Sequence, residues 1–482
     1  MNASLPNVDF WALTPIIIVS ITACAVLLID IFTPISKGKV YPAVAVLGQA
    51  LALIVALIQL GDASVTTFGG SWRTDRFSLF FTITVLISGI LGVLICDSWL
   101  RIRNLGRSEF YTLLLCSVAG VIVTASAHDL ITLFIGIELT SIPTYMLTGF
   151  AKHDQRSNEA SLKYFLLGAF STAILLYGLT WLFGITGGIT YPEIAAFGLG
   201  PGDASKVPLL FAVLLIIVGL GFKSAAVPFH MWTPDAYQGA PTVVTAFMSV
   251  SVKAGAFAAL IRLMVEAVPD LYGSWGPVLA VIAVLTMFVG NIVAIVQEDV
   301  KRMLAYSSVG HTGFILAGLA GWVPNNDMAV ASVLFYSFVY VFMNLGAFGI
   351  LAWLENHGGN TLLDSMDGLF LRFPQAAGAL AIFLLALMGF PLTAGLPAKV
   401  FVFLGAADGG YTWLGVLVFV ASIISAVFYL KVMVRMFMYE PKVALASPRQ
   451  PDMAIALGVC AIATVLLGIL FMPILNLALS AT

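Results

Sequence analysis

Charged residues are scarce in this sequence. Asp, Glu, Lys and Arg make up only 10% of its 482 residues, whereas 60% of the residues are hydrophobic. Because so few charges cannot cover the surface of a soluble protein of this length, the composition predicts a polytopic membrane protein. The apolar runs reach about 18 residues or more, as in membrane-spanning helices, and they lack the alternation of outer-membrane barrel strands. The net charge of −2 gives no indication of nucleic-acid binding.

Cysteines and nucleotide-binding motifs are few or missing as well. The four cysteines lie far apart in apolar runs, so their spacing predicts no disulfide framework, redox motif or metal site. The sequence has no P-loop and no G-x-G-x-x-G after a strand. Its N-terminal segment carries Asp9 and no basic residue before Lys37, which excludes a cleavable signal peptide, so the first apolar run is expected to remain as a helix.

The apolar runs predict an all-α fold of fourteen transmembrane helices, joined by loops too short for a separate soluble domain. The predicted helices lie near residues 12–33, 41–61, 77–97, 109–127, 129–150, 160–184, 208–231, 241–264, 276–297, 302–321, 328–353, 375–406, 412–436 and 452–477.

The Lys and Arg residues of the loops predict the orientation, because cytoplasmic loops of membrane proteins are enriched in them. With the N-terminus outside, fourteen basic residues fall in inner loops and four in outer loops. This bias supports the helix count, since one missed helix would scramble it, and it places both termini outside. The inner residues are Lys37, Lys39, Arg101, Arg103, Arg107, Lys152, Arg156, Lys301, Arg302, Arg372, Lys431, Arg435, Lys442 and Arg449. The outer residues are Arg73, Arg76, Lys206 and Arg262.

The remaining four of the 22 basic residues lie inside apolar spans. Lys253 lies near the middle of "VVTAFMSVSVKAGAFAALI", Lys223 follows fifteen residues of its span, and Lys399 lies in "ALMGFPLTAGLPAKVFVFLG". A lysine at the centre of a membrane helix costs roughly 2.5 to 3.5 kcal/mol, which marks such residues as functional candidates. Lys163 lies close to the start of its helix, where it is either a relay or an anchor that reaches the membrane interface.

Only one carboxylate, Glu138 in "DLITLFIGIELTSIPTYMLTGF", lies deep within a predicted span. A lysine on a facing helix is its natural partner, but one carboxylate cannot neutralise three lysines at bonding distance. Burial and neighbouring like charges disfavour the ammonium form, so we expect some of these lysines to be neutral for part of the time. Such a row indicates a proton path, and it is a poor design for holding helices together.

Other polar residues are candidates for links in this row. His230 follows Lys223 by seven residues, so the two side chains share a face if the helix resumes between them. His311 in "AYSSVGHTGFILAG" is either a relay or a structural hydrogen-bond donor. The hydroxyls of Ser249 and Ser251 are expected beside Lys253.

The seventh and twelfth predicted helices carry breaks. In the seventh, Pro228 removes a backbone hydrogen bond shortly after Lys223. The twelfth span, 375–406, would be about 48 Å long as one straight helix, too long for a hydrocarbon core of about 30 Å. It contains "GFPLTAGLP" just before Lys399. Backbone groups freed inside a membrane need partners, so we expect both breaks to line protein or water.

The two broken segments also predict an inverted repeat. Both contain Gly-Phe and then proline, with a lysine within nine residues of the Gly-Phe, and "ASLKYFL" and "ASVLFYS" open the helices before them. They are five helices apart, and since five is odd the second copy is inverted, as in transporters with a pathway near the midplane. The predicted units are 1–108 (helices 1–3), 109–264 (the first repeat, helices 4–8), 276–436 (the second, helices 9–13) and 452–477 (helix 14).

Four stretches of this chain resemble the antiporter-like membrane subunits of respiratory complex I. They are "GIELTSIPTYML", "GFKSAAVPFHMWTPDAYQGAPTVVTAFMSVSVKAGAFA", "VKRMLAYSSVGHTGFILAGL" and "GFPLTAGLPAKVFVF", and they lie within residues 129–405. Among these subunits the likeness favours the N type. The L type continues into a lateral amphipathic helix after its last span, whereas this chain ends at Thr482, and the M type has glutamate in place of Lys399.

The resemblance implies roles for the intramembrane residues. Glu138 would pair with Lys223, Lys253 would be the central relay, and Lys399 would lie near the exit half. Supporting family positions are matched by Lys163 and His230. The resemblance further implies outward proton pumping in the bacterial cytoplasmic (inner) membrane, driven by electron transfer from NADH to quinone in other membrane and peripheral subunits. Flavin, iron–sulfur clusters and quinone would belong to those partners, and no cofactor to this chain.

Two other functions remain open. The multisubunit sodium/proton antiporters share the same core, although sodium needs hard oxygen ligands and deep carboxylates are scarce here. A purely structural scaffold, held by buried ion pairs, predicts lysine variants that fail to assemble, whereas a proton path predicts variants that assemble without activity.

Overall fold

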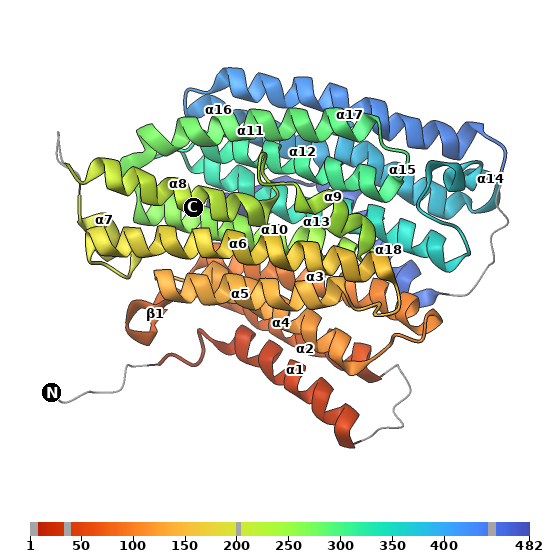
Figure 1. Ribbon diagram of the computed structural model, residues 1–482, viewed down its shortest axis with the longest axis horizontal. Helices are drawn as coiled ribbons and strands as arrows, with labels where there is room; N and C mark the ends of the chain where they lie inside the picture. The colour runs from red at the N-terminus through yellow and green to blue at the C-terminus, as the bar shows by residue number, and fades with distance from the viewer. Residues whose placement is uncertain (1–7, 33–39, 199–203, 442–449) are drawn as a thin grey trace.

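The structure is a bundle of long helices that run side by side, described by a computed structural model for residues 8–32, 40–198, 204–441 and 450–482 (Figure 1). Within these residues, thirteen helices are long and apolar enough to cross a membrane. The predicted twelfth helix is formed by two shorter helices, α15 and α16, in succession. The all-helical membrane fold predicted from the apolar runs is therefore confirmed.

The helices are α1 (Thr14–Phe32), α2 (Val40–Gln59), α3 (Arg76–Ile102), α4 (Ser108–Ser126), α5 (Leu130–Thr148), α6 (Gln155–Thr186), α7 (Tyr191–Ala196), α8 (Lys206–Ser224), α9 (Trp232–Gly239), α10 (Thr242–Ile261), α11 (Tyr272–Ile295), α12 (Val300–Ala320), α13 (Asp327–Asn356), α14 (Leu369–Arg372), α15 (Pro374–Met388), α16 (Gly395–Asp408), α17 (Thr412–Met438), α18 (Pro451–Ile469) and α19 (Met472–Leu479). The short strands β1 (Val65–Thr67) and β2 (Trp72–Thr74) pair antiparallel, and a π-helical turn, η2 (Arg262–Ala267), extends α10.

Several long helices begin at an aspartate that caps the free backbone N–H groups of the first turn. The side chain of Asp75 accepts from the third residue of α3, and Asp129 does the same for α5. Asp154 and Asp299 accept from first-turn N–H groups of α6 and α12. Such caps satisfy donors that a membrane protein cannot leave unpaired, and they fix where each helix enters the bilayer.

The seventh membrane pass is interrupted, as predicted, but the helix ends before the proline. α8 ends at Ser224 because Ala225 adopts a left-handed conformation, with φ of 65°. The N–H of Ala226 then donates to the carbonyl of Gly221 at 2.7 Å, which closes the helix end. Pro228 therefore lies within the break, and the chain becomes helical again only at α9.

The twelfth pass is broken in the same manner. α15 ends at Met388, before Gly389 with φ of 92°, and the N–H of Phe390 donates to the carbonyl of Leu385 at 2.9 Å. α16 begins at Gly395, where an added Cβ would lie 1.7 Å from the carbonyl oxygen of Ala386. Only glycine allows the second half of this pass to start so close to the end of the first.

Matching loop contacts support the predicted repeat. Asp129, the cap of α5, forms an isolated β-bridge with Thr190 in the loop that follows α6. Asp299, the cap of α12, forms the same kind of bridge with Leu362 in the loop that follows α13. These equivalent contacts lie in the two predicted five-helix units, whose boundaries stay a prediction.

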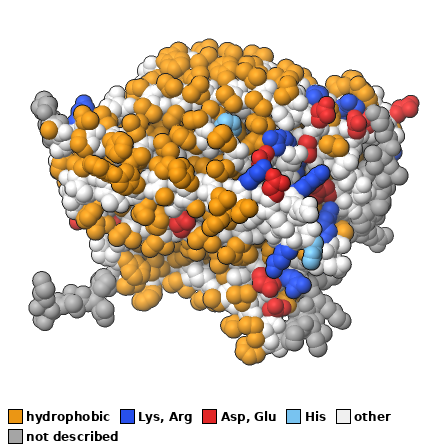
Figure 2. All heavy atoms as spheres, viewed as in Figure 1, with side chains coloured by type: hydrophobic (Ala, Val, Ile, Leu, Met, Phe, Trp, Pro, Cys, Tyr) orange, Lys and Arg blue, Asp and Glu red, His pale blue; other side chains and the backbone are white. Residues whose placement is uncertain are grey.

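The molecular surface separates into a hydrophobic region and a charged end. In Figure 2 hydrophobic side chains cover most of the visible face, and Lys, Arg, Asp and Glu gather toward the right end, where α14 and the start of α18 lie in Figure 1. Four of the predicted inner-loop residues lie outside the described residues: Lys37, Lys39, Lys442 and Arg449.

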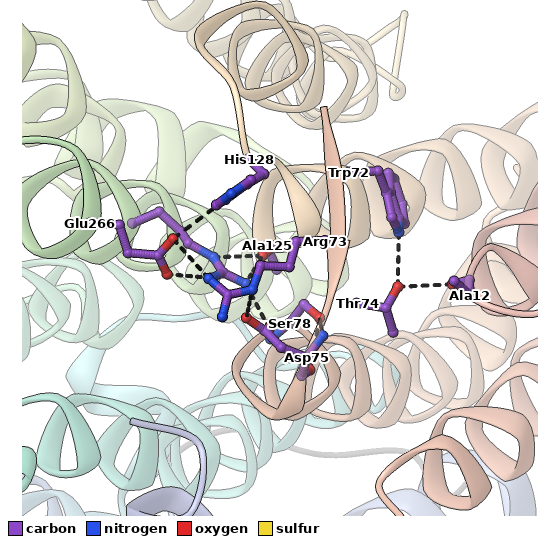
Figure 3. Close-up of polar contacts among 10 residues, drawn as sticks. Ala12, Trp72, Arg73, Thr74, Asp75, Ser78, Ala125, His128 and Glu266 are labelled. Atoms are coloured by element: carbon purple, nitrogen blue, oxygen red, sulfur yellow. Dashed lines mark hydrogen bonds and ion pairs between the residues drawn. The ribbon is translucent and has the colours of Figure 1, made fainter. Parts of the chain in front are cut away.

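One predicted outer-loop residue, Arg262, is buried instead, with a side chain only 1% exposed. It lies 2.7 Å from Asp75 and is also paired with Glu266. Glu266 in turn lies 3.5 Å from His128 (Figure 3). Arg73 on β2 joins the same network at 3.1 Å from Asp75. The sequence pattern did not predict this burial, which arises because α10 continues into a π-turn that keeps the guanidinium inside the bundle next to two carboxylates.

Replacement of Arg262 by glutamine is expected to lower the thermal stability of the protein, since it leaves Asp75 and Glu266 without their buried counter-charge. Removal of one partner of a buried ion pair typically costs roughly 3–5 kcal/mol. The unfolding temperature of the detergent-purified protein measures this effect. Arg76→Gln is the matched control, because Arg76 is exposed at the start of α3, and equal stability of the two variants would contradict the expectation.

Candidate functional site

Lys223 lies in the last turn of α8, against one face of α5. Its Nζ donates to Ser141 Oγ at 2.7 Å and to Tyr145 OH at 3.0 Å, and it lies 3.4 Å from Glu138 Oε1. The Lys223 side chain is 3% exposed and that of Glu138 23%. Thr172 on α6 donates to the same Glu138 oxygen at 2.8 Å. The deep carboxylate therefore lies beside a lysine of a facing helix, as the sequence predicted.

Lys253 is buried in α10 and bonds to α12. Its Nζ donates to the carbonyl and the Oγ of Ser308, at 2.5 and 2.6 Å, and to Thr312 Oγ1 at 3.0 Å. Neither Ser249 nor Ser251 is among the described hydrogen-bond partners of this ammonium, and their hydroxyls hydrogen-bond to side chains on α13 and α3. The whole of α10 is buried, so its hydrophobic pattern does not reveal which neighbour each side chain meets.

The hydroxyl of Thr312 links the second lysine to the break beside the first. It accepts a hydrogen bond from Lys253 Nζ and donates to the carbonyl of Ser224 at 2.7 Å. Ser224 is the last residue of α8 and follows Lys223 directly. A small cavity of about 10 Å³ next to Lys223, bounded by Gly255 on α10, is close to the volume that one water molecule requires.

Lys399 caps the C-terminal end of α15, the first half of the broken twelfth pass. Its Nζ, on α16, donates to the carbonyls of Met388 at 2.7 Å and Leu387 at 3.0 Å, which end α15. The ammonium also lies 4.9 Å from the centre of the Phe314 ring on α12. A cation at a helix C-terminus is electrostatically favoured, so this lysine is partnered without a carboxylate.

His311 lies on α12 within a group of tyrosines. Its Nδ1 lies 2.6 Å from Tyr336 OH and its Nε2 3.2 Å from Tyr429 OH. The OH of Tyr340 donates to Ser308 Oγ at 2.9 Å, and its ring centre lies 5.1 Å from that of His311. The histidine thus belongs to a polar cluster that extends from the partners of Lys253 toward α13 and α17.

The supporting residue Lys163 is not in this buried row. Its side chain is 45% exposed and lies 2.7 Å from Glu159 and 3.1 Å from Asp235. Arg302 lies 2.8 Å from the same Asp235, and Lys163, Glu159 and Asp235 line a cavity of about 490 Å³. Of the two alternatives open from the sequence, the geometry fits an interface anchor at the charged end of the bundle.

His230 lies in the break between α8 and α9, where the chain is not helical. The face that it was predicted to share with Lys223 therefore does not form. Its Nδ1 is buried and has no hydrogen-bond partner among the described residues.

A second carboxylate, Asp97, is also buried in a membrane helix, although the sequence pattern placed it at a helix end. α3 extends beyond it to Ile102, and the Asp97 side chain is 6% exposed. It lies 2.6 Å from Arg101 and accepts from Tyr111 OH at 2.9 Å. Because arginine stays charged, this carboxylate has a permanent counter-ion, which Glu138 lacks.

Sequence reasoning missed the hydroxyl partners of the lysines, although their spacing contains a signal. Ser141 and Tyr145 follow Glu138 by three and seven residues, which places all three on one face of α5. Ser308 and Thr312 are likewise four residues apart on α12.

Among the described residues, no group of three or more His, Cys, Asp or Glu side chains could hold a metal ion.

Comparison with known proteins gives the family. Residues 127–425 match the family described as NADH:quinone oxidoreductase/Mrp antiporter, transmembrane. The NADH-quinone oxidoreductase subunit N of Chloroflexus aggregans is 41% identical over 480 residues, which cover 99% of this chain and 98% of that relative. The subunit N of Trichlorobacter lovleyi is 41% identical over 434 residues, 89% of this chain and 88% of the relative.

Solved structures agree with these relatives. A chain of respiratory complex I from Thermus thermophilus superposes with a TM-score of 0.80 at 31% identity and covers 97% of this chain and 100% of that one. A chain of the Mrp complex from Dietzia has a TM-score of 0.85, covering 98% and 97%, but its 19% identity indicates a shared fold alone. Since the family match covers more than half of the sequence and relatives align over nearly all of it, the chain belongs to the NADH:quinone oxidoreductase/Mrp antiporter family of transmembrane proteins.

Proposed function

We propose that this chain is a proton-translocating membrane subunit of an NADH-quinone oxidoreductase, in which an intramembrane Glu/Lys relay moves the protons. The observation that supports the relay most directly is that Glu138 lies beside Lys223 and that Thr312 joins Lys253 to the carbonyl of Ser224, the residue that follows Lys223 in the chain. The full-length similarity to subunits N supports the assignment of the enzyme complex. This chain itself carries no redox centre in the proposal.

The driving event in this proposal is electrostatic. When Glu138 moves away from Lys223, the ammonium loses the only carboxylate that pairs with it among the described residues, and its charged form becomes less favourable. The proton then passes toward Lys253, with Thr312 between the two sites. From Lys253 the tyrosine cluster around His311 leads toward the half of the bundle that holds Lys399.

The proposal also fixes orientation and partners. A proton enters from the inner side near Lys223 and leaves toward the outside through Lys399. Both chain termini then lie on the outer side of a bacterial inner membrane, in agreement with the excess of basic residues in the predicted inner loops. Flavin, iron–sulfur clusters and quinone belong to other membrane and peripheral subunits, whose electron transfer supplies the energy.

Replacement of Lys223 or Lys253 by alanine is expected to reduce NADH-driven proton pumping by about tenfold or more, which corresponds to a barrier increase of at least about 1.4 kcal/mol. Each variant removes the only side chain at its site that can carry the proton as an ammonium. Proton uptake into vesicles that contain the reconstituted complex measures pumping, and NADH:quinone activity measures coupling.

Lys206→Ala is the control, because Lys206 lies on the same helix as Lys223 but is exposed at its opposite end. Assembly is checked by copurification of the flavin and iron–sulfur subunits. Full pumping by both relay variants in assembled complexes would overturn the proposal, whereas failure of both to assemble would favour the structural scaffold.

Replacement of Thr312 by valine is expected to slow pumping while Thr312→Ser retains most of it. Valine keeps the shape of threonine but leaves Lys253 with one acceptor fewer and the Ser224 carbonyl without its donor, an effect of roughly 1–3 kcal/mol. Thr464→Val is the matched control, since that buried hydroxyl donates only to Cys460 of its own helix. Equal pumping by all three variants would show that the Thr312 hydroxyl lies outside the route.

A second candidate function is sodium/proton exchange within a multisubunit antiporter, which the fold shared with the Dietzia Mrp chain favours. The described lysines argue against it, because Lys223 and Lys253 occupy the oxygens that a sodium ion would need. Replacement of sodium by choline is therefore expected to leave NADH-driven pumping unchanged. Sodium-dependent transport by a purified complex without flavin and iron–sulfur subunits would establish the antiporter instead.

A further inference from the structure

A groove with an apolar wall and a basic rim lies between α4, α5 and α6, and neither the fold nor the proposed relay explains it. Its volume is about 710 Å³, similar to that of small-molecule binding pockets. The wall residues are Leu105, Leu113, Tyr145, Met146, Phe150, Leu162 and Phe165. The polar rim is formed by Arg107, Glu109, Lys152, His153 and Asn158.

The rim cations lack internal partners. Arg107 and Lys152 are exposed, and neither forms an ion pair with any residue that the structure describes. The other two large cavities differ, because in each of them one lining cation already forms ion pairs. Arg101 lies between two aspartates in one, and in the other Lys163 shares Asp235 with a second cation.

The wall faces sideways, toward the lipid. Met146, Leu162 and Phe165 are 55%, 58% and 49% exposed, on helices that cross the membrane. The rim lies where α4 begins and α5 ends, at the charged end of the bundle seen in Figure 2. An occupant must therefore combine an anionic head at the membrane boundary with an apolar tail that extends into the bilayer.

We propose that this groove binds an anionic glycerophospholipid, with its phosphate between Arg107 and Lys152 and one acyl chain along Met146, Leu162 and Phe165. Basic pockets between membrane helices on the cytoplasmic side are a recognised setting for phospholipid headgroups. A free phosphate ion would neutralise the cations of the rim but leave the apolar wall uncovered. A neutral lipid would cover the apolar wall but leave the two cations of the rim without a counter-ion.

The groove reaches the relay at one residue. The ring of Tyr145 lines the wall, and its hydroxyl accepts the hydrogen bond from Lys223 Nζ at 3.0 Å. The ring also packs edge-on against Tyr164 and Phe165, with centres 4.5 and 6.0 Å apart. A bound acyl chain thus restrains the tyrosine that holds the first lysine. The lipid site stands without the relay, and only this last link rests on the proposed function.

The test uses the delipidated intact complex, incubated with phosphatidylglycerol or with phosphatidylcholine of the same acyl chains. Bound lipid is counted by native mass spectrometry, and the difference between wild type and variant isolates this groove from other lipid sites. Arg107→Gln/Lys152→Gln is expected to lose one phosphatidylglycerol, with its preference over phosphatidylcholine reduced about tenfold to thirtyfold for two cations. Inorganic phosphate is expected not to compete.

Two further variants sharpen the outcome. Met146→Trp fills the wall and is expected to displace the lipid while the rim stays intact. Arg372→Gln/Lys206→Gln removes the same charge elsewhere and is expected to retain the lipid. Unchanged phosphatidylglycerol binding in the rim variant, or displacement of the lipid by inorganic phosphate, would overturn the proposal. A cross-link from a photoreactive side chain at Leu162 to another protein subunit would also overturn it.

The link to the relay has its own readout. If the rim variant loses the lipid but pumps protons normally, the proposal of a lipid site stands and only the proposed effect of the lipid on Tyr145 is refuted. Loss of pumping in the Lys223 variant with lipid binding unchanged would separate the two proposals in the opposite direction.

Discussion

An ammonium group buried in a membrane needs oxygen atoms as hydrogen-bond partners. Much of this fold provides such partners for three buried lysines. Lys399 takes the two carbonyls that the end of α15 leaves free, and Lys253 takes a carbonyl and two hydroxyls from α12. Lys223 alone lies near a carboxylate, Glu138. The break in the twelfth pass thus supplies backbone oxygens at the depth where Lys399 lies.

The two helix breaks share a similar backbone geometry, whereas the lysines beside them lie at different positions relative to the break. Both end in a left-handed residue closed by the same hydrogen-bond pattern, from Ala226 to Gly221 and from Phe390 to Leu385. Yet Lys223 lies in the last turn before its break, whereas Lys399 lies after its break, in the second half-helix. Similar backbone breaks therefore place Lys223 and Lys399 in different electrostatic environments. This difference suits the proposed pathway, in which Lys223 lies at the entry and Lys399 at the exit.

The sequence predicted what depends on hydropathy and on backbone chemistry. Long apolar runs and Gly/Pro clusters located the membrane passes and both breaks, and the scarcity of carboxylates pointed from Glu138 to a lysine partner. It could not predict which face of a fully buried helix meets which neighbour, since a helix without a polar side has no orienting pattern. For that reason the partners of Lys253 were sought in its own helix and the burial of Arg262 was missed. Likewise, the ion pair between Lys163 and Asp235 joins two helices far apart in the sequence, which hydropathy does not predict.

The contacts of Lys223 explain how a buried ion pair can act as a switch without damage to the fold. A lysine that lost its only partner would carry an unpaired donor into an apolar interior, at a large cost. Here Ser141 and Tyr145 also accept hydrogen bonds from Nζ, so in the proposed relay the ammonium would keep two oxygen partners if Glu138 withdrew. What changes is the balance of charge, because neutral hydroxyls solvate an amine and an ammonium alike but do not cancel a positive charge. Motion of one partly exposed carboxylate can therefore alter whether the lysine keeps its proton, while the helices around it stay in place.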